Sequence, residues 1–434
     1  MELPGDKSIS HRYAILASLA EGTSELQNYS SAADCQSTLE CLKRLGVPME
    51  TKERKAAEGE VSFAAGESAT VLRIGGRGLD GWSAPKRTLD AGNSGTTLRL
   101  LTGALAGQRF ESKITGDGSL RKRPMRRILE PLRMMGAEID ANEDKFAPLE
   151  IRGSRLRGIE YATPIASAQV KSCVLLAGLF AEGETTVREP VATRDHSEVA
   201  LREFGARVAA AKGVVRIFGR PKMEARALTV PGDLSSAVFF LAAALILPGS
   251  ALMIRNVGLN PTRARILDLL IEMGAGIHVA SVQMKEGELV GDLVVQNEKG
   301  NSLKGGKISG AQTAEMIDEL PMMAALGPYT EDGVEIRDAR ELRVKESDRI
   351  ATMAAALKAM GAAVEEFEGG LRVAGRGAGK LRGAKVHTHG DHRIAMAMAV
   401  AALGAEGETT IKDAECVGVS FPEFFGLMER VVEK

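Results

Sequence analysis

Internal repetition is the feature that most constrains this chain. Six times, a short polar turn opens onto a run of apolar residues. The openings begin at Gly5, Gly92, Ser167, Gly232, Ala314 and Gly390. They are spaced roughly 65–90 residues apart, whereas the repeats of stacked solenoids are ~20–50 residues long. The repetition therefore predicts six copies of a larger strand–helix–strand–helix unit.

Each copy contains two helices of different character. The first helix is apolar nearly all round, so we expect it to be buried. The second is amphipathic and ends at an apolar residue followed by glycine, which supplies the left-handed residue of a helix end. These pairs are Leu45-Gly46, Met135-Gly136, Phe204-Gly205, Met273-Gly274 and Met360-Gly361. A last helix over residues 424–432 ends with the chain instead.

The repeats also predict the domain organisation. A chain of 434 residues is too long for one comfortable hydrophobic core. Six copies divide most simply into two α/β domains of three, and the fourth copy begins at Val230. We therefore expect a first domain over residues 7–229 and a second over residues 230–434, to which residues 1–6 return.

Composition excludes several classes of partner. Lys and Arg number 56 against 57 for Asp and Glu, and aromatic residues make up 4%, so neither charge nor stacking surfaces favour nucleic acid. The longest apolar run, residues 237–247, is shorter than the ~20 residues that cross a bilayer. The four cysteines form no CxxC pair, and no signal peptide opens the chain. These features predict a cytoplasmic protein without nucleic-acid or membrane partners.

The helix openings are candidate anion sites. A helix that begins at Gly, Ser or Asn presents free N–H groups and the positive end of its dipole. Lys7, Ser8 and Arg12 share the first opening, where the two cations could reach one anion. The alternative for each opening is an ordinary N-cap beside solvated cations.

Two further charged segments have both a structural and a functional interpretation. Residues 120–127 form a dense basic run, either a solvated loop or a loop that supplies an arginine to a small anionic ligand. In residues 341–350, Lys345 and Arg349 lie four apart on an expected helix, with Glu346 beside them. That segment is either a salt-bridge lattice or a cluster of proton donors and anion clamps.

Residues 387–393 and Asp318 are the remaining candidates. His387, His389 and His392 resemble a metal site, and a metal hydrolase is the corresponding alternative function. No HExxH helix or Cys pair supports it, and Arg393 would repel a cation, so we expect no metal. Asp318 is flanked by apolar residues and is either a helix-capping carboxylate or, if partly buried, a general base.

Taken together, these segments resemble the 3-phosphoshikimate 1-carboxyvinyltransferase (EPSP synthase) family. The resemblance runs from Leu3 to about Met428. Its motifs are Pro4-Gly-Asp-Lys-Ser-Ile-Ser-His-Arg12, Gly92-Asn-Ser-Gly-Thr96, Lys122-Arg-Pro124, Ser167-Ala-Gln169, Arg343-Val-Lys-Glu-Ser-Asp-Arg349 and Asp391-His-Arg393. In this order the motifs are highly specific.

The resemblance implies a fold and a reaction. The fold has two domains, each of three βαβαββ-like units around buried helices, with the active site in the cleft between them. The reaction transfers the enolpyruvyl group of phosphoenolpyruvate to the 5-hydroxyl of shikimate 3-phosphate through a tetrahedral intermediate, and releases phosphate. The resemblance further implies a monomer of the shikimate pathway that needs no cofactor and is a target of glyphosate.

The resemblance also implies residue roles. Shikimate 3-phosphate would contact Lys7, Ser8, Arg12, Ser167, Ala168, Gln169, Arg194, Asp318 and Lys345. Phosphoenolpyruvate would contact Lys7, Asn93, Gly95, Arg123, Gln169, Arg349 and Arg393. Asp318 would be the base, and Lys7, Glu346 and His392 are the candidates for protonating the methylene carbon.

One departure and one related enzyme bear on this reading. Some family members carry a lysine that meets phosphoenolpyruvate where this chain has Val419. The nearest alternative is UDP-N-acetylglucosamine enolpyruvyl transferase, a family that commonly carries a cysteine in its mobile loop. Residues 116–127 contain no cysteine, which favours the shikimate enzyme.

Overall fold

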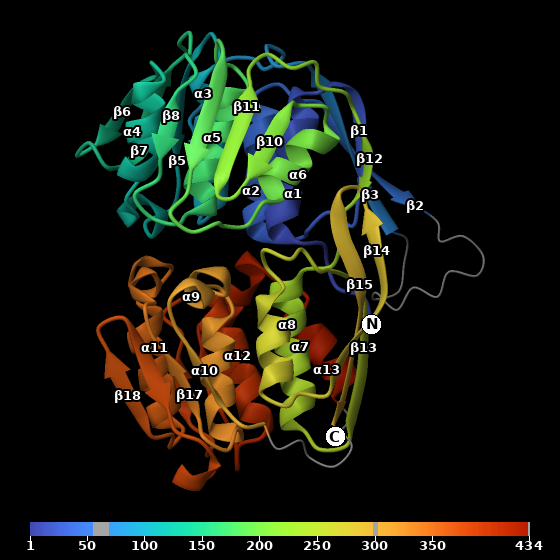
Figure 1. Ribbon diagram of the computed structural model, residues 1–434, viewed down its shortest axis with the longest axis vertical. Coiled ribbons are helices and arrows are strands. Elements are labelled where there is room, and N and C mark those ends of the chain that lie inside the picture. The colour runs from blue at the N-terminus through green and yellow to red at the C-terminus, as the bar shows by residue number, and fades with distance from the viewer. Residues whose placement is uncertain (55–68, 298–302, 433–434) are drawn as a thin grey trace. The chain divides into compact units, whose positions relative to one another are not determined.

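The chain forms two compact units in a computed structural model that describes residues 1–54, 69–297 and 303–432 (Figure 1). The first unit, here the N-unit, comprises Pro4–Pro231 and Lys285–Glu288. The second, here the C-unit, comprises Met1–Leu3, Gly232–Met284 and Leu289–Lys434. Each unit has its own hydrophobic core.

In its described residues, the N-unit contains three pairs of helices and three four-stranded sheets. The helices are α1 (Lys7–Leu19), α2 (Ala33–Arg44), α3 (Gly95–Ala106), α4 (Arg126–Met134), α5 (Ala168–Gly178) and α6 (His196–Glu203). A 3-10 turn, η1 (Leu120–Lys122), precedes α4.

The three sheets of the N-unit share one topology. In each, a short first strand pairs in parallel with a second strand, and the others pair antiparallel. The orders are β12-β1-β3-β2, β4-β5-β7-β6 and β8-β9-β11-β10. The strands are β1 (Glu21–Gln27), β2 (Met49–Arg54), β3 (Ala69–Arg77), β4 (Leu89–Asp90), β5 (Glu111–Thr115), β6 (Glu138–Asn142), β7 (Phe146–Arg152), β8 (Glu160–Ala162), β9 (Glu184–Arg188), β10 (Val208–Ala211), β11 (Val214–Phe218) and β12 (Ala227–Thr229).

The C-unit repeats this plan with more variation. Its sheets are β13-β15-β14, β16-β17-β19-β18 and the two-stranded β20-β21. Its helices are α7 (Leu234–Ile246), α8 (Arg265–Glu272), α9 (Ala311–Glu315), α10 (Leu320–Leu326), α11 (Arg349–Ala359), α12 (His392–Leu403) and α13 (Phe424–Val431). Its strands are β13 (Ser250–Gly258), β14 (Ile277–Lys285), β15 (Glu288–Asn297), β16 (Gly306–Ile308), β17 (Val334–Ile336), β18 (Val364–Phe367), β19 (Gly370–Val373), β20 (Lys385–His387) and β21 (Thr410–Lys412). Its 3-10 turns are η2 (Gly327–Tyr329), η3 (Arg340–Val344), η4 (Arg376–Ala378) and η5 (Ala414–Val419).

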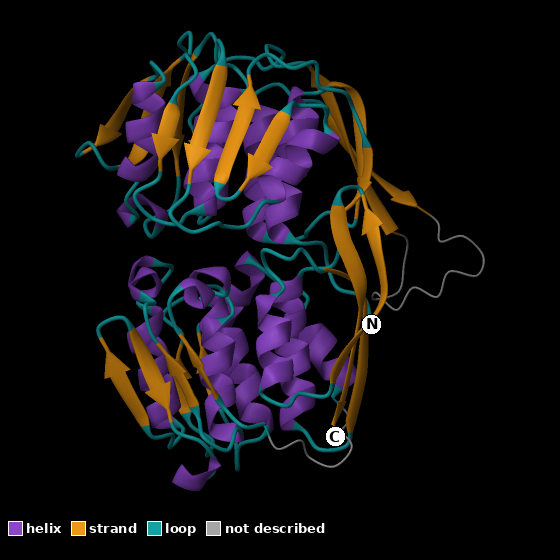
Figure 2. Cartoon of the chain, in the orientation of Figure 1, coloured by secondary structure: helices purple, strands orange, loops and turns teal. Residues whose placement is uncertain are grey.

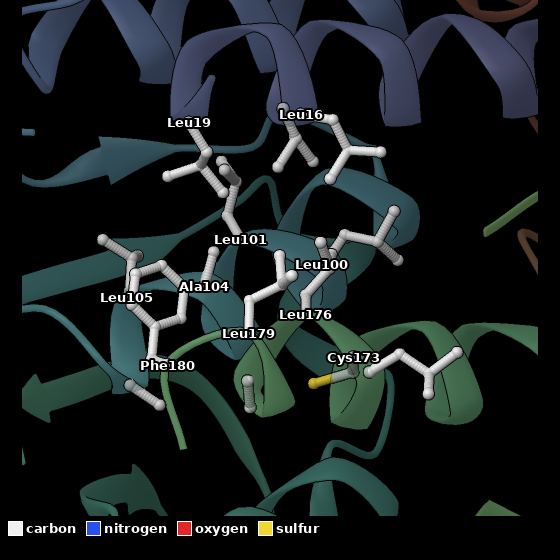
Figure 3. Close-up of a cluster of buried hydrophobic side chains, with 14 of the residues drawn as sticks. Leu16, Leu19, Leu100, Leu101, Ala104, Leu105, Cys173, Leu176, Leu179 and Phe180 are labelled. Carbon is white, nitrogen blue, oxygen red and sulfur yellow. The ribbon is translucent and has the colours of Figure 1, made fainter. Parts of the chain in front are cut away.

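The first helix of each pair lies inside its unit, as the apolar runs predicted. In the N-unit, α1, α3 and α5 pack together behind the strands that face the viewer in Figure 2, and nearly all of their residues are buried. Figure 3 shows Leu16 of α1, Leu101 of α3 and Leu176 of α5 meeting in this core. Burying each such side chain contributes about 1.5–3 kcal/mol. Because these helices face protein on all sides, they need apolar residues all round.

Close contact between α3 and α5 requires a glycine. A Cβ at Gly103 would lie 2.2 Å from the carbonyl oxygen of Cys173, which is backbone and cannot turn away. The second helices also end as predicted, because Gly46, Gly136, Gly205, Gly274 and Gly361 all have φ between +83° and +97°.

The limits of the units differ from the expected ones at three places, one of which is the boundary itself, where Val230 and Pro231 belong to the N-unit. Residues 4–6 belong to the N-unit, since the Asp6 N–H donates to the carbonyl of Pro231 at 2.7 Å. Residues 285–288, between β14 and β15, also belong to it. There Glu286 accepts from the N–H of Thr229, and Glu288 Oε1 lies 2.7 Å from His196 Nδ1. No helix within the described residues is long and apolar enough to cross a membrane.

We predict that Gly103→Ala lowers the free energy of unfolding by about 1–3 kcal/mol, because the added methyl group forces α3 and α5 apart. Urea unfolding measures this. The matched control is Gly426→Ala in α13, where nothing lies within 4 Å of the added Cβ. That change should leave stability unchanged or raise it by about 0.5–1 kcal/mol. Equal stabilities of the two variants would contradict the close packing.

Candidate active site

Lys7, at the first position of α1, is held by a carboxylate from the neighbouring helix. Its Nζ lies 2.7 Å from Oδ2 of Asp34 in α2, and both side chains are largely buried. Asp6 caps α1 by accepting from the N–H of Ile9. The carbonyl of Asp34 also accepts from Thr97 Oγ1, in the first turn of α3. The starts of α1 and α3 are thereby tied together beside one ammonium group.

Arg12 lies one turn further along α1 and is fixed by three hydrogen bonds. Nε donates to Ser197 Oγ at 2.7 Å, Nη2 to Ser172 Oγ at 2.8 Å, and Nη1 to the carbonyl of Ser8 at 2.8 Å. Burial lowers the pKa of Arg12 to about 10, so the side chain remains a cation at neutral pH. Arg194 is near enough to contribute to this lowering of the pKa of Arg12.

The start of α3 gathers the other predicted residues of the N-unit. Arg123 Nη2 donates to Asn93 Oδ1 at 2.9 Å. A Cβ at Gly95 would lie 3.5 Å from Arg123 Nη1 and 2.8 Å from Nη1 of Arg99. Arg99 in turn donates to Gln169 Oε1 at 2.5 Å. Two guanidinium groups therefore converge over the first turn of a buried helix.

The first residues of α5 complete the N-unit group. Ser167 is the N-cap and accepts from the N–H of Val170, and Ala168 is the first helical residue. Gln169 follows and also donates through Nε2 to Thr96 Oγ1 at 2.9 Å. Contacts between Arg12 and Ser172, and between Arg99 and Gln169, place the starts of α1, α3 and α5 at one end of the unit.

In the C-unit, the central cation is Arg349, the first residue of α11. Its side chain is 1% exposed, with Nε 2.8 Å from Asp391 Oδ2 and Nη2 2.6 Å from Glu346 Oε2. Burial disfavours the charge, but Asp391 and Glu346 outweigh it and raise the pKa of Arg349. Burial likewise acts to raise the pKa of Asp391, and Arg349 overcomes this to lower it.

Asp318 has three cationic groups around one carboxylate oxygen. Its Oδ1 lies 3.9 Å from Lys345 Nζ, 3.8 Å from Arg349 Nη1 and 3.9 Å from Arg393 Nε. Its carbonyl accepts from Arg393 Nη1 at 2.8 Å. The Asp318 side chain is 20% exposed, so the carboxylate is partly buried yet reachable. Burial lowers the pKa of Lys345, and Asp318 opposes that shift.

One expectation about local structure was wrong. Lys345 is not on the helix with Arg349, because η3 ends at Val344 and Asp348 caps a helix that begins at Arg349. Asp318 lies between α9 and α10, and Glu319 occupies the N-cap position of α10, which favours the second of the two alternatives for Asp318, a partly buried carboxylate. His392 is buried at the first position of α12, next to the N-cap Asp391.

The histidine segment does not form a metal site in the part of the chain that is described, where no three metal-binding side chains are suitably grouped. The rings of His387 and His389 lie 6.3 Å apart, centroid to centroid. His389 lies in a turn with φ of +52°, and His392 begins the next helix.

Comparison with known proteins identifies the family. Residues 1–428 match the model for EPSP synthase (3-phosphoshikimate 1-carboxyvinyltransferase). The chain belongs to this family. The 3-phosphoshikimate 1-carboxyvinyltransferases of Solibacter usitatus and Koribacter versatilis are 54% and 52% identical to it, covering 99% and 100% of this chain and 96% of each relative.

Solved structures support the same fold. The EPSP synthase from Acinetobacter baumannii has a TM-score of 0.84 and 40% identity, covering 99% of this chain and 95% of that one. The enolpyruvyl transferase NikO from Streptomyces tendae has a TM-score of 0.75 and 19% identity, covering 99% and 94%, and shows the fold alone. The predicted fold class and enzyme class are therefore confirmed, and the UDP-N-acetylglucosamine alternative is not favoured.

The sequence alone did not point to several residues that hold the candidate site together. Ser172 and Ser197 bind Arg12 from 160 and 185 residues away, and no local pattern marks them. No sequence pattern marked Asp34 in α2 as the partner of Lys7 either. A pattern did mark Arg99, because it lies four residues after Gly95 and therefore on the same helix face.

We predict that Asp391→Asn lowers the free energy of unfolding at pH 7 by about 3–5 kcal/mol, because the buried guanidinium of Arg349 loses the charge of the carboxylate at its Nε and keeps only that of Glu346 nearby. The folded pKa of Asp391 lies below its ordinary value of 3.8. Its stabilisation is therefore complete above that value and is lost as the pH falls through the folded pKa. The gap between wild type and variant should shrink in acid.

Urea unfolding at pH 7 and near pH 3 measures this gap. The control is Asp80→Asn, which removes an exposed ion pair with Arg220 and should cost at most about 1 kcal/mol. A gap that is unchanged or larger in acid would contradict the assignment.

Proposed function

We propose that this chain joins phosphoenolpyruvate to shikimate 3-phosphate and releases phosphate, with the groups of the N-unit and the C-unit acting on one substrate pair. The observation that carries the proposal is the setting of Asp318, a partly buried carboxylate with three cationic groups within 4 Å of one oxygen. Two polyanionic substrates repel each other, so a site that brings them together needs converging positive charge. The three cationic groups around Asp318 could bind the substrate anions and so bring the substrate hydroxyl group to a carboxylate that accepts its proton.

In the N-unit, we assign shikimate 3-phosphate to the starts of α1 and α5. Arg12 and Arg194 supply charge, Ser8 and Ser167 supply hydroxyl groups, and Ala168 supplies backbone. Lys7 and Gln169 are shared by the two substrates. Phosphoenolpyruvate is assigned to the start of α3, where Asn93, Gly95 and Arg123 lie together. A helix start with guanidinium groups above it favours a dianion.

In the C-unit, Arg349 and Arg393 are assigned to phosphoenolpyruvate, and Lys345 to shikimate 3-phosphate. Asp318 accepts the proton from the 5-hydroxyl as the hydroxyl oxygen bonds to C2 of phosphoenolpyruvate, while an acid adds a proton to C3. The tetrahedral adduct then loses phosphate from C2 and a proton from C3, which restores the double bond. Acid and base must be different groups in different surroundings.

Three residues remain candidates for the acid. Lys7 is held by Asp34, Glu346 is bound to Arg349, and His392 is buried at the start of α12. The reaction uses no metal or organic cofactor, and the enzyme acts in the cytoplasm as a monomer. Four free cysteines, with burial raising the pKa of Cys41 and Cys173 to about 12, suit that compartment.

The experiment that tests the function is release of phosphate from phosphoenolpyruvate, with and without shikimate 3-phosphate, in the presence of a metal chelator. Strict dependence on shikimate 3-phosphate is expected. Dependence on UDP-N-acetylglucosamine instead would select the related enzyme, and loss of activity to the chelator would contradict a metal-free reaction.

We predict that Asp318→Asn retains much of the substrate binding but lowers kcat about 10²–10⁴-fold, the usual contribution of a general base. Steady-state phosphate release measures kcat, and calorimetric titration measures binding of shikimate 3-phosphate. The control is Asp268→Asn, an exposed carboxylate of α8 paired with Arg265, which should leave kcat within about twofold. Near-normal turnover of Asp318→Asn would remove Asp318 from the role of base.

A further inference from the structure

Arg99 makes a contact that the assignment of substrate residues leaves unexplained. It lies on α3, one turn after Gly95, and its Nη1 donates to Oε1 of Gln169 at 2.5 Å. The other end of the same amide, Nε2, donates to Thr96 Oγ1 at 2.9 Å. Both polar ends of the Gln169 amide are thus held by residues from the first turns of α3.

The contact with Arg99 fixes the orientation of the Gln169 amide, with Oε1 toward Arg99 and Nε2 toward Thr96. A glutamine amide has an accepting oxygen and a donating NH₂ group of nearly the same shape, so it can present either end to a ligand. A guanidinium group only donates. If the amide reversed, its NH₂ group would oppose the donors of Arg99. Arg99 therefore holds Oε1 and leaves the NH₂ group on the side of Thr96.

Arg99 also occupies the space that a side chain at position 95 would need. A Cβ built on Gly95 would meet Nη1 of Arg99 at 2.8 Å and Nη1 of Arg123 at 3.5 Å. The missing side chain of Gly95 thus admits two guanidinium groups above the first turn of α3. Like charges repel, so their convergence favours an anion at this point.

We propose that Arg99 is a positioning residue for phosphoenolpyruvate. It orients the Gln169 amide so that its NH₂ group, rather than its oxygen, is presented to the anion, and it does so from the space left by Gly95. An anion needs a donor, and an amide oxygen in the same place would repel it. This inference rests on the proposed function, because it assigns a role at the same substrate site.

The test uses Arg99→Met, Arg99→Lys and the exposed control Arg109→Met, which lies just beyond the other end of α3. Arg99→Met should raise the KM for phosphoenolpyruvate about 10–100-fold, while the KM for shikimate 3-phosphate, which also contacts Gln169, should rise by a clearly smaller factor. Arg99→Lys should recover part of the loss, since an ammonium group can also donate to Oε1. Arg109→Met should change neither KM.

A double-mutant cycle tests the link to Gly95. The methyl group of Gly95→Ala would displace the Arg99 guanidinium, so the two changes remove the same contact. The KM for phosphoenolpyruvate of the double variant should then be no higher than that of the worse single variant. Gln169→Glu keeps the acceptor for Arg99 but removes the NH₂ group, and it should raise that KM even with Arg99 in place.

Three results would overturn the proposal: an unchanged KM for phosphoenolpyruvate in Arg99→Met, an equal rise for both substrates, or multiplicative effects in the cycle. Thermal unfolding of each variant separates these results from loss of folding. If the wild type releases no phosphate, the proposed function fails. Calorimetric titration with inorganic phosphate then tests Arg99 alone, and weaker binding by Arg99→Met than by Arg109→Met is expected.

Discussion

The candidate site depends on keeping buried cations charged before any substrate arrives. An arginine that is 1% exposed, as Arg349 is, loses its hydration, and the cost is several kcal/mol unless a carboxylate replaces the water. Asp391 replaces it at 2.8 Å and, with its other oxygen, accepts from the N–H of Arg393 at the start of α12. The Asp391 carboxylate thus caps α12, pairs with Arg349 and accepts a hydrogen bond from the backbone N–H of Arg393.

The N-unit meets the same constraint differently. Lys7 has a carboxylate partner in Asp34, whereas two serine hydroxyls and a carbonyl surround Arg12. Neutral acceptors do not cancel its charge, and burial lowers the pKa of Arg12 to about 10. The nearby charge of Glu198 opposes this lowering, so the guanidinium stays a cation, and its hydrogen bonds to neutral acceptors fix its orientation. Arg123 is oriented in a similar way by the side-chain oxygen of Asn93.

Some of this architecture was predictable because the information is local. An apolar run bounded by a polar turn shows a buried helix, and a glycine after an apolar residue shows where the next helix stops. Contacts across the chain were not predictable. Ser172 and Ser197 look like any other serines, and their role exists only because α5 and the start of α6 pack against α1.

The position of Lys345 was predicted wrongly because charged residues at a spacing of four suggest a helix, whereas the capping side chain of Asp348 starts the helix at Arg349. The roles of the individual site residues came from the resemblance to a family, not from any pattern in the residues.

The short segment between β14 and β15 has a consequence for how the chain can be divided. The N-unit is not one continuous stretch, because residues 285–288 belong to it. His196, directly before Ser197, is buried against Glu288, and the N–H of Thr229 is satisfied by Glu286. A fragment ending at residue 231 would carry an uncovered imidazole next to the serine that holds Arg12. The two halves of the gene therefore do not encode two independently complete domains. The N-unit, encoded mainly in the first half, also needs the four residues 285–288, which are encoded in the second half.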